Sequence, residues 1–278
     1  MPSADAAQTA SGAPSTCSGQ APSTSLGQAP STGSTSSPQA SSGQAPSKAF
    51  SLASIVLPVY NQADHIGQRV EAYVEELRGS ALPWELILVT NACRDDSAKV
   101  AGELALRFPE VRTIDSVPGG WGLAVKLGLK EARGDLLAYT NTARTDPLTL
   151  RQIFDVAVAN PGSVVKARRS ARGAWRKLGS TLYNLECRLL FGLRWGDVNG
   201  TPKFFPRRFD RLLMLRRDDD LIDAEFSMLC SRNGYPLIEV PVVWGKRTSG
   251  KSTTKLSSAV KMYLGAYQLS KTSRTGAQ

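Results

Sequence analysis

A polar turn near the middle of the chain carries side chains that could bind a ligand. Residues 136–140 predict a buried strand, and Asn141, Thr142, Arg144 and Asp146 follow it before a proline. In an α/β protein, ligands gather at the carboxyl ends of such strands. The turn therefore offers an amide, hydroxyls, one carboxylate and a guanidinium, whose fork of donors matches phosphate oxygens.

Two earlier predicted strands, at residues 54–61 and 84–89, also end in polar residues. A nucleotide would lie over their carboxyl ends, where the ring of Tyr60 could pack on a base. Asn91 offers an amide that both donates and accepts hydrogen bonds. Asp95 could orient a ribose or cap the next helix. These positions predict a nucleotide-binding crevice.

Two acidic residues, Asp223 and Glu225, are the candidates for a general base. If the protein transfers a group to a hydroxyl acceptor, one of these two carboxylates should take the proton of that hydroxyl. If the acceptor is a phosphate, no strong base is required, and Lys203 and the arginines become more important. Residues two apart do not share a face of a helix, so at most one of the pair should reach the reacting centre.

Predicted strands and helices alternate up to residue 140, at lengths typical of a parallel, doubly wound sheet. The second half of the chain is mixed. Its predicted elements are helices at 148–160, 175–191, 221–233 and 256–269, a short strand at 164–166, a loop and edge strand at 199–206, and a strand at 237–244. Together the two halves predict one α/β domain.

The first 47 residues do not belong to this domain. They are built mainly of Ala, Pro, Ser, Thr, Gly and Gln, and hold too few apolar side chains to offset the entropy of ordering their backbone. We expect a disordered tail at 1–47, a domain at 48–270 and a flexible C-terminus at 271–278.

The charge and the cysteines restrict the partners and the compartment. The chain has a net charge of +10, and the part after the tail carries +11, which favours anionic partners. The basic residues cluster beside the predicted phosphate site without interleaved aromatic residues, so no nucleic-acid partner is expected. Scattered cysteines and the lack of an apolar run long enough to span a bilayer indicate a cytoplasmic protein. Peripheral contact with the inner membrane surface stays open.

Four segments, in order, resemble glycosyltransferase family 2 and, within it, the dolichyl- and polyprenyl-phosphate sugar transferases. They are Pro58–Gln62, Val89–Ser97, Asp197–Phe205 and Asp223–Val242. The first is similar to Pro-x-Tyr-Asn-Glu, with Gln62 in place of the usual glutamate. The resemblance implies a GT-A fold, a Rossmann-like mixed sheet flanked by helices. It also implies an inverting transfer of a sugar from a nucleoside diphosphate to a lipid phosphate or a hydroxyl.

Taken with the chemistry of the strand ends, the resemblance implies roles for particular residues. The predicted catalytic residues are Asp223, Glu225 and Arg144. The predicted donor-binding residues are Pro58, Tyr60, Asn61, Gln62, Asn91, Asp95, Asn141, Arg168 and Arg169. The predicted acceptor-binding residues are Asn199, Lys203, Arg247 and Lys251.

Residues 141–143 stand where the family carries a metal-binding Asp-x-Asp pair. Asn141 is neutral and Ala143 has no ligand atom, whereas hard cations prefer anionic oxygens. We hypothesise that Arg144 and the basic residues after the next strand stabilise the leaving diphosphate in place of the metal. The competing idea keeps Mg²⁺ or Mn²⁺ on Asp146 and phosphate oxygens.

Two alternative functions remain. Gly245–Ser252 fits the phosphate-loop pattern Gly-x-x-x-x-Gly-Lys-Ser between a predicted strand and a helix. Only 26 residues follow it, so the other parts of a P-loop NTPase are not expected. The second alternative is a non-catalytic protein that binds nucleotide sugars, since a fold does not guarantee an activity.

Overall fold

The structure is a computed structural model that describes residues 50–169, 174–194, 196–242 and 256–275. The chain divides between Gln44 and Ala45, and every described helix and strand lies after this division.

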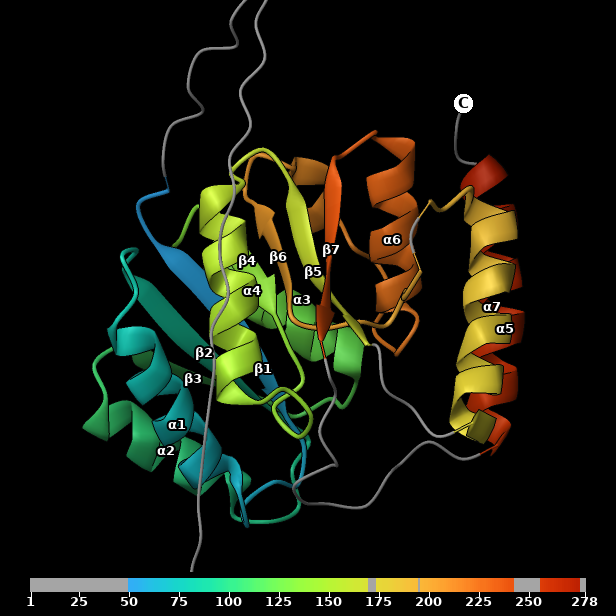
Figure 1. The fold of residues 1–278 in the computed structure, drawn as a ribbon. Helices are drawn as coiled ribbons and strands as arrows, with labels where there is room; N and C mark the ends of the chain where they lie inside the picture. The colour runs from blue at the N-terminus through green and yellow to red at the C-terminus, as the bar shows by residue number, and fades with distance from the viewer. Residues whose placement is uncertain (1–49, 170–173, 195, 243–255, 276–278) are drawn as a thin grey trace, which may run out of the picture. The chain divides into compact units, whose positions relative to one another are not determined.

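Strands and helices alternate from β1 to α5 (Figure 1). In chain order the elements are β1 (Ala53–Val59), α1 (Ile66–Arg78), β2 (Trp84–Asn91), α2 (Ser97–Arg107), β3 (Val111–Ser116), α3 (Trp121–Glu131), β4 (Leu136–Tyr139), α4 (Pro147–Ala159), β5 (Val164–Arg169), α5 (Ala174–Phe191), β6 (Lys203–Pro206), the 3₁₀ helix η1 (Asp210–Leu213), α6 (Ile222–Arg232), β7 (Leu237–Val242) and α7 (Leu256–Thr275).

The strands form one mixed sheet in the order β3-β2-β1-β4-β6-β5-β7. The first four strands of the chain are parallel, as the alternating pattern predicts. β6 runs antiparallel to both β4 and β5 and lies inside the sheet, so the predicted edge strand at 199–206 is wrong. The reason is visible in Phe204 and Phe205, which are both fully buried, on opposite faces of the sheet. A strand covered on both faces reads as a continuous apolar run.

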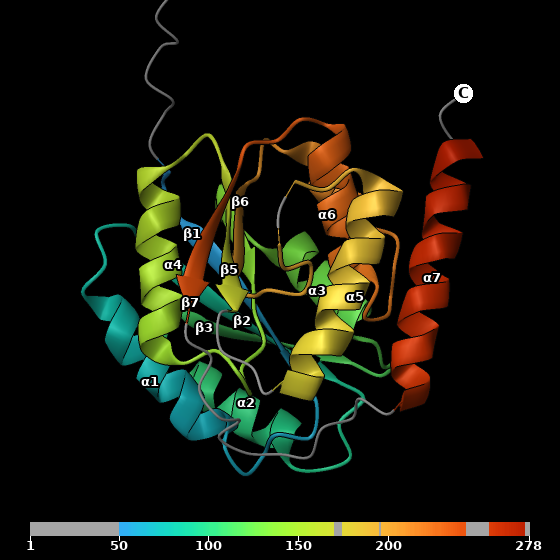
Figure 2. The same ribbon diagram turned by 45° about the vertical axis from the view of Figure 1, so that its right-hand side comes forward.

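Helices cover both faces of the sheet (Figure 2). On one face, α1, α2 and α4 pack through an apolar cluster that includes Val70, Leu104 and Phe154. On the other face, α3, η1 and α6 pack through a cluster that includes Leu129 and Phe226. Each such side chain stabilises the fold by about 1.5–3 kcal/mol when it is fully buried.

α5 and α7 form a further layer beside α6. They pack together through a cluster that includes Tyr183, Met228 and Ala266 (Figure 2). α7 continues to Thr275, so helix occupies most of the C-terminal segment that the sequence predicts to be flexible. Across the described ranges, no helix combines the length and the hydropathy needed to cross a bilayer.

Candidate functional site

The strand directions bring the predicted site residues to one edge of the sheet. β5 points the same way as β4, because β6 is antiparallel to both of them. β7 is parallel to β5, and β1, β2 and β3 are parallel to β4. The carboxyl ends of all these strands therefore share one edge, at which β6 begins with Lys203. We call this the carboxyl edge.

Side-chain hydrogen bonds tie the turns after β1, β2 and β4 together at the carboxyl edge. The hydroxyl of Thr142 donates to Oε1 of Gln62 (2.6 Å). The backbone N–H of Gln62 donates to Oγ of Ser97 (2.8 Å), and that of Arg94 donates to Oδ1 of Asn61 (2.8 Å). Asn61 has a φ of 48°, which asparagine tolerates better than most residues. The structure thus joins three turns that the sequence only predicted to be near one another.

Asn91 and Asp95, at and just after the end of β2, hold neighbouring turns. The N–H of Gly120 donates to Oδ1 of Asn91 (2.8 Å). Asp95 accepts hydrogen bonds from the N–H of Ala63 (3.1 Å) and from the hydroxyl of Ser97 (2.5 Å). Partial burial opposes ionisation, but the hydrogen bonds outweigh it and hold the pKa of Asp95 below its usual range. Asn91 therefore holds the turn before α3, and Asp95 holds the turn after β1, through these hydrogen bonds.

Pro58 and Tyr60 differ in what they offer a ligand. Tyr60 is 44% exposed directly after β1, so its ring is open to stacking on a planar group. Pro58 lies within β1, opposite Val89 of β2, and is buried. Pro58 is therefore part of the buried sheet and presents little surface to a ligand.

The turn after β4 is closed by its own hydrogen bonds. Oδ1 of Asn141 accepts from the N–H of Ala143 (3.1 Å), and the carbonyl of Asn141 accepts from the N–H of Thr145 (3.0 Å). The hydroxyls of Thr140 and Thr145 lie 2.7 Å apart, and the Tyr73 hydroxyl donates to the carbonyl of Thr145 (2.7 Å). The amide oxygen of Asn141 is thus engaged in holding the turn.

The oxygens of this turn do not fit a metal site built on two carboxylates. Asp146 caps α4: its Oδ1 accepts from the N–H of Thr149 (2.9 Å) and its Oδ2 accepts from the Thr149 hydroxyl (2.6 Å). Ala143 has no side-chain ligand. Within the described ranges, no three or more His, Cys, Asp and Glu side chains form a group that could hold a metal ion.

Lys203 lies inside the molecule instead of on its surface. Its fully buried ammonium forms an ion pair with Oδ1 of Asp223, which also accepts from the Tyr139 hydroxyl (2.8 Å). The rings of Tyr139 and Phe226 lie 5.3 and 5.6 Å from Nζ. Burial lowers the pKa of Lys203, although Asp223 opposes that change. The ammonium of Lys203, which the sequence predicted to bind an acceptor, therefore forms an ion pair with Asp223, a candidate general base.

A second fully buried lysine lies next to Lys203. Lys166 faces it across the β5–β6 pair and forms an ion pair with Oε1 of Glu239 (3.2 Å). Burial lowers the pKa of Lys166 to about 8, although Glu239 opposes that change. Glu239 also accepts from the backbone N–H groups of Gly196 (2.9 Å) and Asp197 (3.1 Å). Glu239 thereby connects β5 to the loop before β6.

The two arginines at the end of β5 have different surroundings. Nε of Arg169 donates to Oδ2 of Asp197 (2.6 Å), as part of a two-pronged ion pair. Arg168 is exposed. The charge of Arg169 is therefore balanced within the chain, and Arg168 presents its side chain to solvent.

Glu225 fastens the loop that precedes α6. Its carboxylate accepts from the N–H groups of Arg216 (3.0 Å) and Arg217 (2.9 Å). The loop packs on the start of α3 so closely that a Cβ at Gly122 would lie 2.4 Å from the carbonyl oxygen of Arg217. Glu225 thus orders a loop, whereas Asp223 contacts the buried lysine.

The other predicted acceptor residues lie before β6 and after β7. Oδ1 of Asn199 is buried and has no hydrogen-bond partner among the described residues. Arg247, Lys251 and the whole phosphate-loop pattern Gly245–Ser252 lie outside the described residues.

Tyr139 and Glu239 contact the site residues but were not predicted from the sequence. Both lie within predicted strands, where a tyrosine such as Tyr139 is expected to be a packing residue. A usable signal was present in Lys166 and Glu239, which are charged residues inside apolar strands. Such charges need buried partners, because an unpaired buried charge is very costly.

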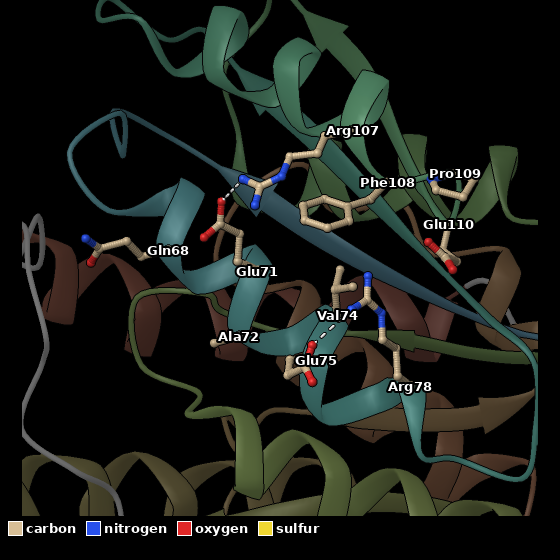
Figure 3. A pocket seen from close by; sticks show the side chains of 10 residues that line it. All are labelled: Gln68, Glu71, Ala72, Val74, Glu75, Arg78, Arg107, Phe108, Pro109 and Glu110. Atoms are coloured by element: carbon tan, nitrogen blue, oxygen red, sulfur yellow. Dashed lines mark hydrogen bonds and ion pairs between the residues drawn. The ribbon is translucent and has the colours of Figure 1, made fainter.

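A surface hollow of about 820 Å³ lies between α1 and α2, beside the beginning of β3 and thus away from the carboxyl edge (Figure 3). Four of its five charged side chains pair with one another: Arg107 pairs with Glu71, and Arg78 with Glu75 (3.0 Å), whereas Oε2 of Glu110 has no hydrogen-bond partner among the described residues. Arg107 also stacks on Phe108 with its guanidinium carbon 4.9 Å from the ring centre. Both arginines of the hollow are therefore already paired, and Glu110 is the lining carboxylate that forms no ion pair within the part of the chain that the structure describes.

Comparisons with known proteins find one family and several relatives. Residues 54–184 match the model of "Glycosyl transferase family 2". A dolichyl-phosphate beta-glucosyltransferase of Trichomonas vaginalis is 24% identical over 80% of this chain and 72% of its own length. An undecaprenyl-phosphate 4-deoxy-4-formamido-L-arabinose transferase of Proteus mirabilis is 25% identical over 72% of this chain. The chain spans 61% of the Proteus enzyme and 32% of glycosyltransferase AglD of Haloferax volcanii, which is 29% identical over 69% of this chain.

A solved structure has the same fold. Glucosyl-3-phosphoglycerate synthase from Mycobacterium tuberculosis, in complex with Mn²⁺, UDP-glucose and phosphoglyceric acid, superposes with a TM-score of 0.60. The two chains are 18% identical, over 82% of this chain and 81% of the synthase.

Proposed function

Since this chain belongs to glycosyl transferase family 2 and has the GT-A fold, we propose that it transfers a sugar from a nucleoside diphosphate to a polyprenyl phosphate, with inversion. One observation carries the proposal: Asn61, Gln62 and Thr142 join the turns after β1, β2 and β4 into one surface at the carboxyl edge. Ligands of open α/β sheets bind at this edge.

In this proposal the nucleotide lies over the ends of β1 and β2. The exposed ring of Tyr60 stacks on the base, and Asn91 and Asp95 border the ribose. The backbone N–H groups of Gly120 and Ala63 donate hydrogen bonds that hold these two side chains in place when no nucleotide sugar is bound. A site that is already ordered loses less conformational entropy on binding.

The leaving diphosphate develops negative charge that the protein must stabilise. The mycobacterial synthase was solved with Mn²⁺ and UDP-glucose. Here Asn141, Ala143 and Asp146 do not fit a two-carboxylate metal site. We propose that Arg144, in the same turn, and the exposed Arg168, at the end of β5, contact the diphosphate oxygens instead.

A polyprenyl phosphate acceptor agrees with the names of the dolichyl- and undecaprenyl-phosphate relatives. An oxygen of the acceptor phosphate attacks the anomeric carbon of the sugar. The bond from that carbon to the nucleoside diphosphate breaks, and the nucleoside diphosphate leaves with the electron pair. Because the phosphate oxygen is already anionic, this reaction needs no general base.

Asp223 is the general base only if the acceptor is a hydroxyl. Its Oδ1 is held by Tyr139 and Lys203, so the carboxylate has a fixed orientation near the start of β6. The ion pair with the buried ammonium of Lys203 adds to this constraint. Lys203 therefore positions Asp223 and does not itself contact the acceptor.

The test incubates the full chain with UDP- and GDP-sugars and a short-chain polyprenyl phosphate, with Mn²⁺ or with EDTA. We expect release of the nucleoside diphosphate that requires the acceptor and persists in EDTA. Arg144→Ala should lower kcat by about 100-fold. The control is Arg133→Ala, an exposed arginine before the start of β4, which should change kcat less than about twofold. Strict Mn²⁺ dependence would refute the role of the arginines.

The same assay separates the alternative functions. A protein that only binds nucleotide sugars would show a rise in melting temperature with a donor but no turnover. A P-loop NTPase would hydrolyse a nucleoside triphosphate and lose that activity in Lys251→Ala. For a transferase we expect no such hydrolysis.

A further inference from the structure

α5 and α7 lie side by side on the outer side of α6 (Figures 1 and 2). The rings of Tyr183 and Tyr263 meet edge to face at 5.6 Å, and the Tyr263 hydroxyl donates to the carbonyl of Gly179 (2.8 Å). A Cβ at Gly265 would lie 2.2 Å from Leu221, so α7 packs tightly beside the start of α6. The two helices are thus held together and to the domain.

The outward face of α5 is apolar although it faces solvent. Leu182, Leu185 and Leu189 are 50%, 48% and 78% exposed, and their spacing places them on one side of the helix. The buried side of the helix carries Tyr183 and Cys187. A stripe of leucines opposite the core does not stabilise the folded domain by itself. Such an exposed apolar patch indicates an interaction surface.

The outward face of α7 combines apolar and basic side chains. Leu264 and Tyr267 are about half exposed, and Lys261 and Lys271 are exposed beside them. Nζ of Lys271 lies 4.6 Å from the centre of the Tyr267 ring. Long cationic side chains of this kind keep their charge at an interface while their stems cover apolar surface.

The described side chains of this layer carry a net positive charge. Residues 179–191 and 261–271 contain three basic residues, Arg188, Lys261 and Lys271, and one acidic residue, Glu186. Glu186 is half-buried, and burial raises its pKa. No exposed carboxylate therefore opposes an anionic surface on the described side chains of the two helices, 179–191 and 261–271.

We propose that the outward face of α5 and α7, made of Leu182, Leu185, Leu189, Lys261, Leu264, Tyr267 and Lys271, docks on an anionic lipid bilayer. Exposed leucines enter the boundary between headgroups and acyl chains, and the lysines contact lipid phosphates. α5 joins β5 to β6, and α6 beneath it carries Asp223. If the proposed function holds, docking brings the carboxyl edge close to the headgroup of a lipid acceptor.

The experiment measures co-sedimentation of the full chain with vesicles of phosphatidylcholine alone or with phosphatidylglycerol. Binding should require phosphatidylglycerol and weaken with salt, because screening reduces the attraction. Lys261→Gln with Lys271→Gln should weaken binding about 25-fold, at about fivefold for each lysine. The matched control, Lys99→Gln with Lys130→Gln, removes two exposed lysines of α2 and α3 and should stay within about twofold.

The apolar contribution is tested separately. Leu185→Gln with Leu189→Gln should weaken vesicle binding by at least about tenfold, whereas Leu106→Gln, at the most exposed leucine of α2, should have little effect. All variants should keep the thermal shift that a nucleotide sugar produces. This readout separates a failure of docking from a failure of the proposed transferase.

Three outcomes would overturn the proposal. The first is that the unmodified chain does not bind anionic vesicles. The second is that the control variants lose binding as much as the face variants do. The third is that the chain is a dimer in sedimentation velocity and that Leu185→Gln with Leu189→Gln dissociates it without affecting vesicle binding, since the face would then bind a second copy. If the leucine variant fails to fold, the lysine pair and its control decide the question.

Discussion

The two halves of the sheet support the carboxyl edge in different ways. One row of paired residues crosses the sheet from Val56 through Tyr139 and Lys203 to Lys166 and Glu239. In the β1–β4 half, the row is apolar or aromatic, and the polar contacts stand in the turns beyond the strands. In the half formed by β5, β6 and β7, the row itself is charged and buried.

The difference predicts how strongly substitutions and pH should change stability in each half of the sheet. Neutral hydrogen bonds in a turn contribute about 0.5–1.5 kcal/mol each, and solvent can replace them in part. A buried ion that loses its partner remains as an uncompensated charge. Single substitutions and pH should therefore affect the charged half much more than the turns of the other half.

The largest expected effect is that of Lys203→Met. It removes the cation and leaves the carboxylate of Asp223 buried, so the free energy of unfolding should fall by about 3–5 kcal/mol. Urea denaturation measures this change. The double variant Lys203→Met with Asp223→Leu should cost less than the single variant. A loss below about 1 kcal/mol in the single variant would show that the two halves do not differ as argued.

The second effect concerns pH. The pKa of Lys166 is lowered from 10.5 in the unfolded chain to about 8 in the folded protein. Below pH 8 the lysine is charged in both states. Between pH 8 and pH 10.5 the folded state releases its proton first, so the unfolded state binds more protons and stability rises with pH.

We expect the free energy of unfolding of the unmodified protein, relative to Lys166→Met, to increase over this window by up to about 1.4 kcal/mol per pH unit. Denaturation curves of both proteins at several pH values measure the slope. Parallel pH curves for the two proteins would contradict the lowered pKa of Lys166.

The third effect is smaller and belongs to the turn after β4. Asp146→Ala removes the cap of α4 and should lower stability by about 1 kcal/mol, whereas Asp146→Asn keeps a good capping residue and should be nearly neutral. Activity assayed with and without Mn²⁺ adds a second readout. A large loss of activity in Asp146→Asn would favour a metal held by this carboxylate.

The smallest effect is the coupling between Gln62 and Thr142. Their hydrogen bond joins the turns after β1 and β4, so a double-mutant cycle with Gln62→Ala and Thr142→Val should give a coupling energy of about 0.5–1.5 kcal/mol. Purely additive effects of the two substitutions would mean that the turns are held separately.

The sequence predicted the first half of the molecule well for a physical reason. Its strands and helices alternate, so each strand end and the motif beside it are neighbours in the chain. Parallel pairing of β1 with β2 and with β4 then brings Asn61, Asn91 and Asn141 to one edge. Local pattern and connectivity were enough to predict this arrangement.

The second half could not be predicted in the same way. β6 enters the sheet between β4 and β5, and this position depends on contacts between residues far apart in the chain. The pairs Lys203–Asp223 and Lys166–Glu239 join residues that are 20 and 73 positions apart. No spacing rule connects such residues, so the ion pair between Lys203 and Asp223 was not predicted.

By itself, the sequence determined the family, the alternating strands and helices, and the absence of an Asp pair at residues 141–143. These properties follow from motifs and periodicity, which are local. Only the tertiary structure decided which charges are used inside the protein and which surfaces remain. Burial pairs Lys166 and Lys203 with carboxylates, and the packing of α5 on α6 leaves Leu182, Leu185 and Leu189 facing outward. Partnership and exposure depend on all the neighbours of a side chain, and the fold alone assembles those neighbours.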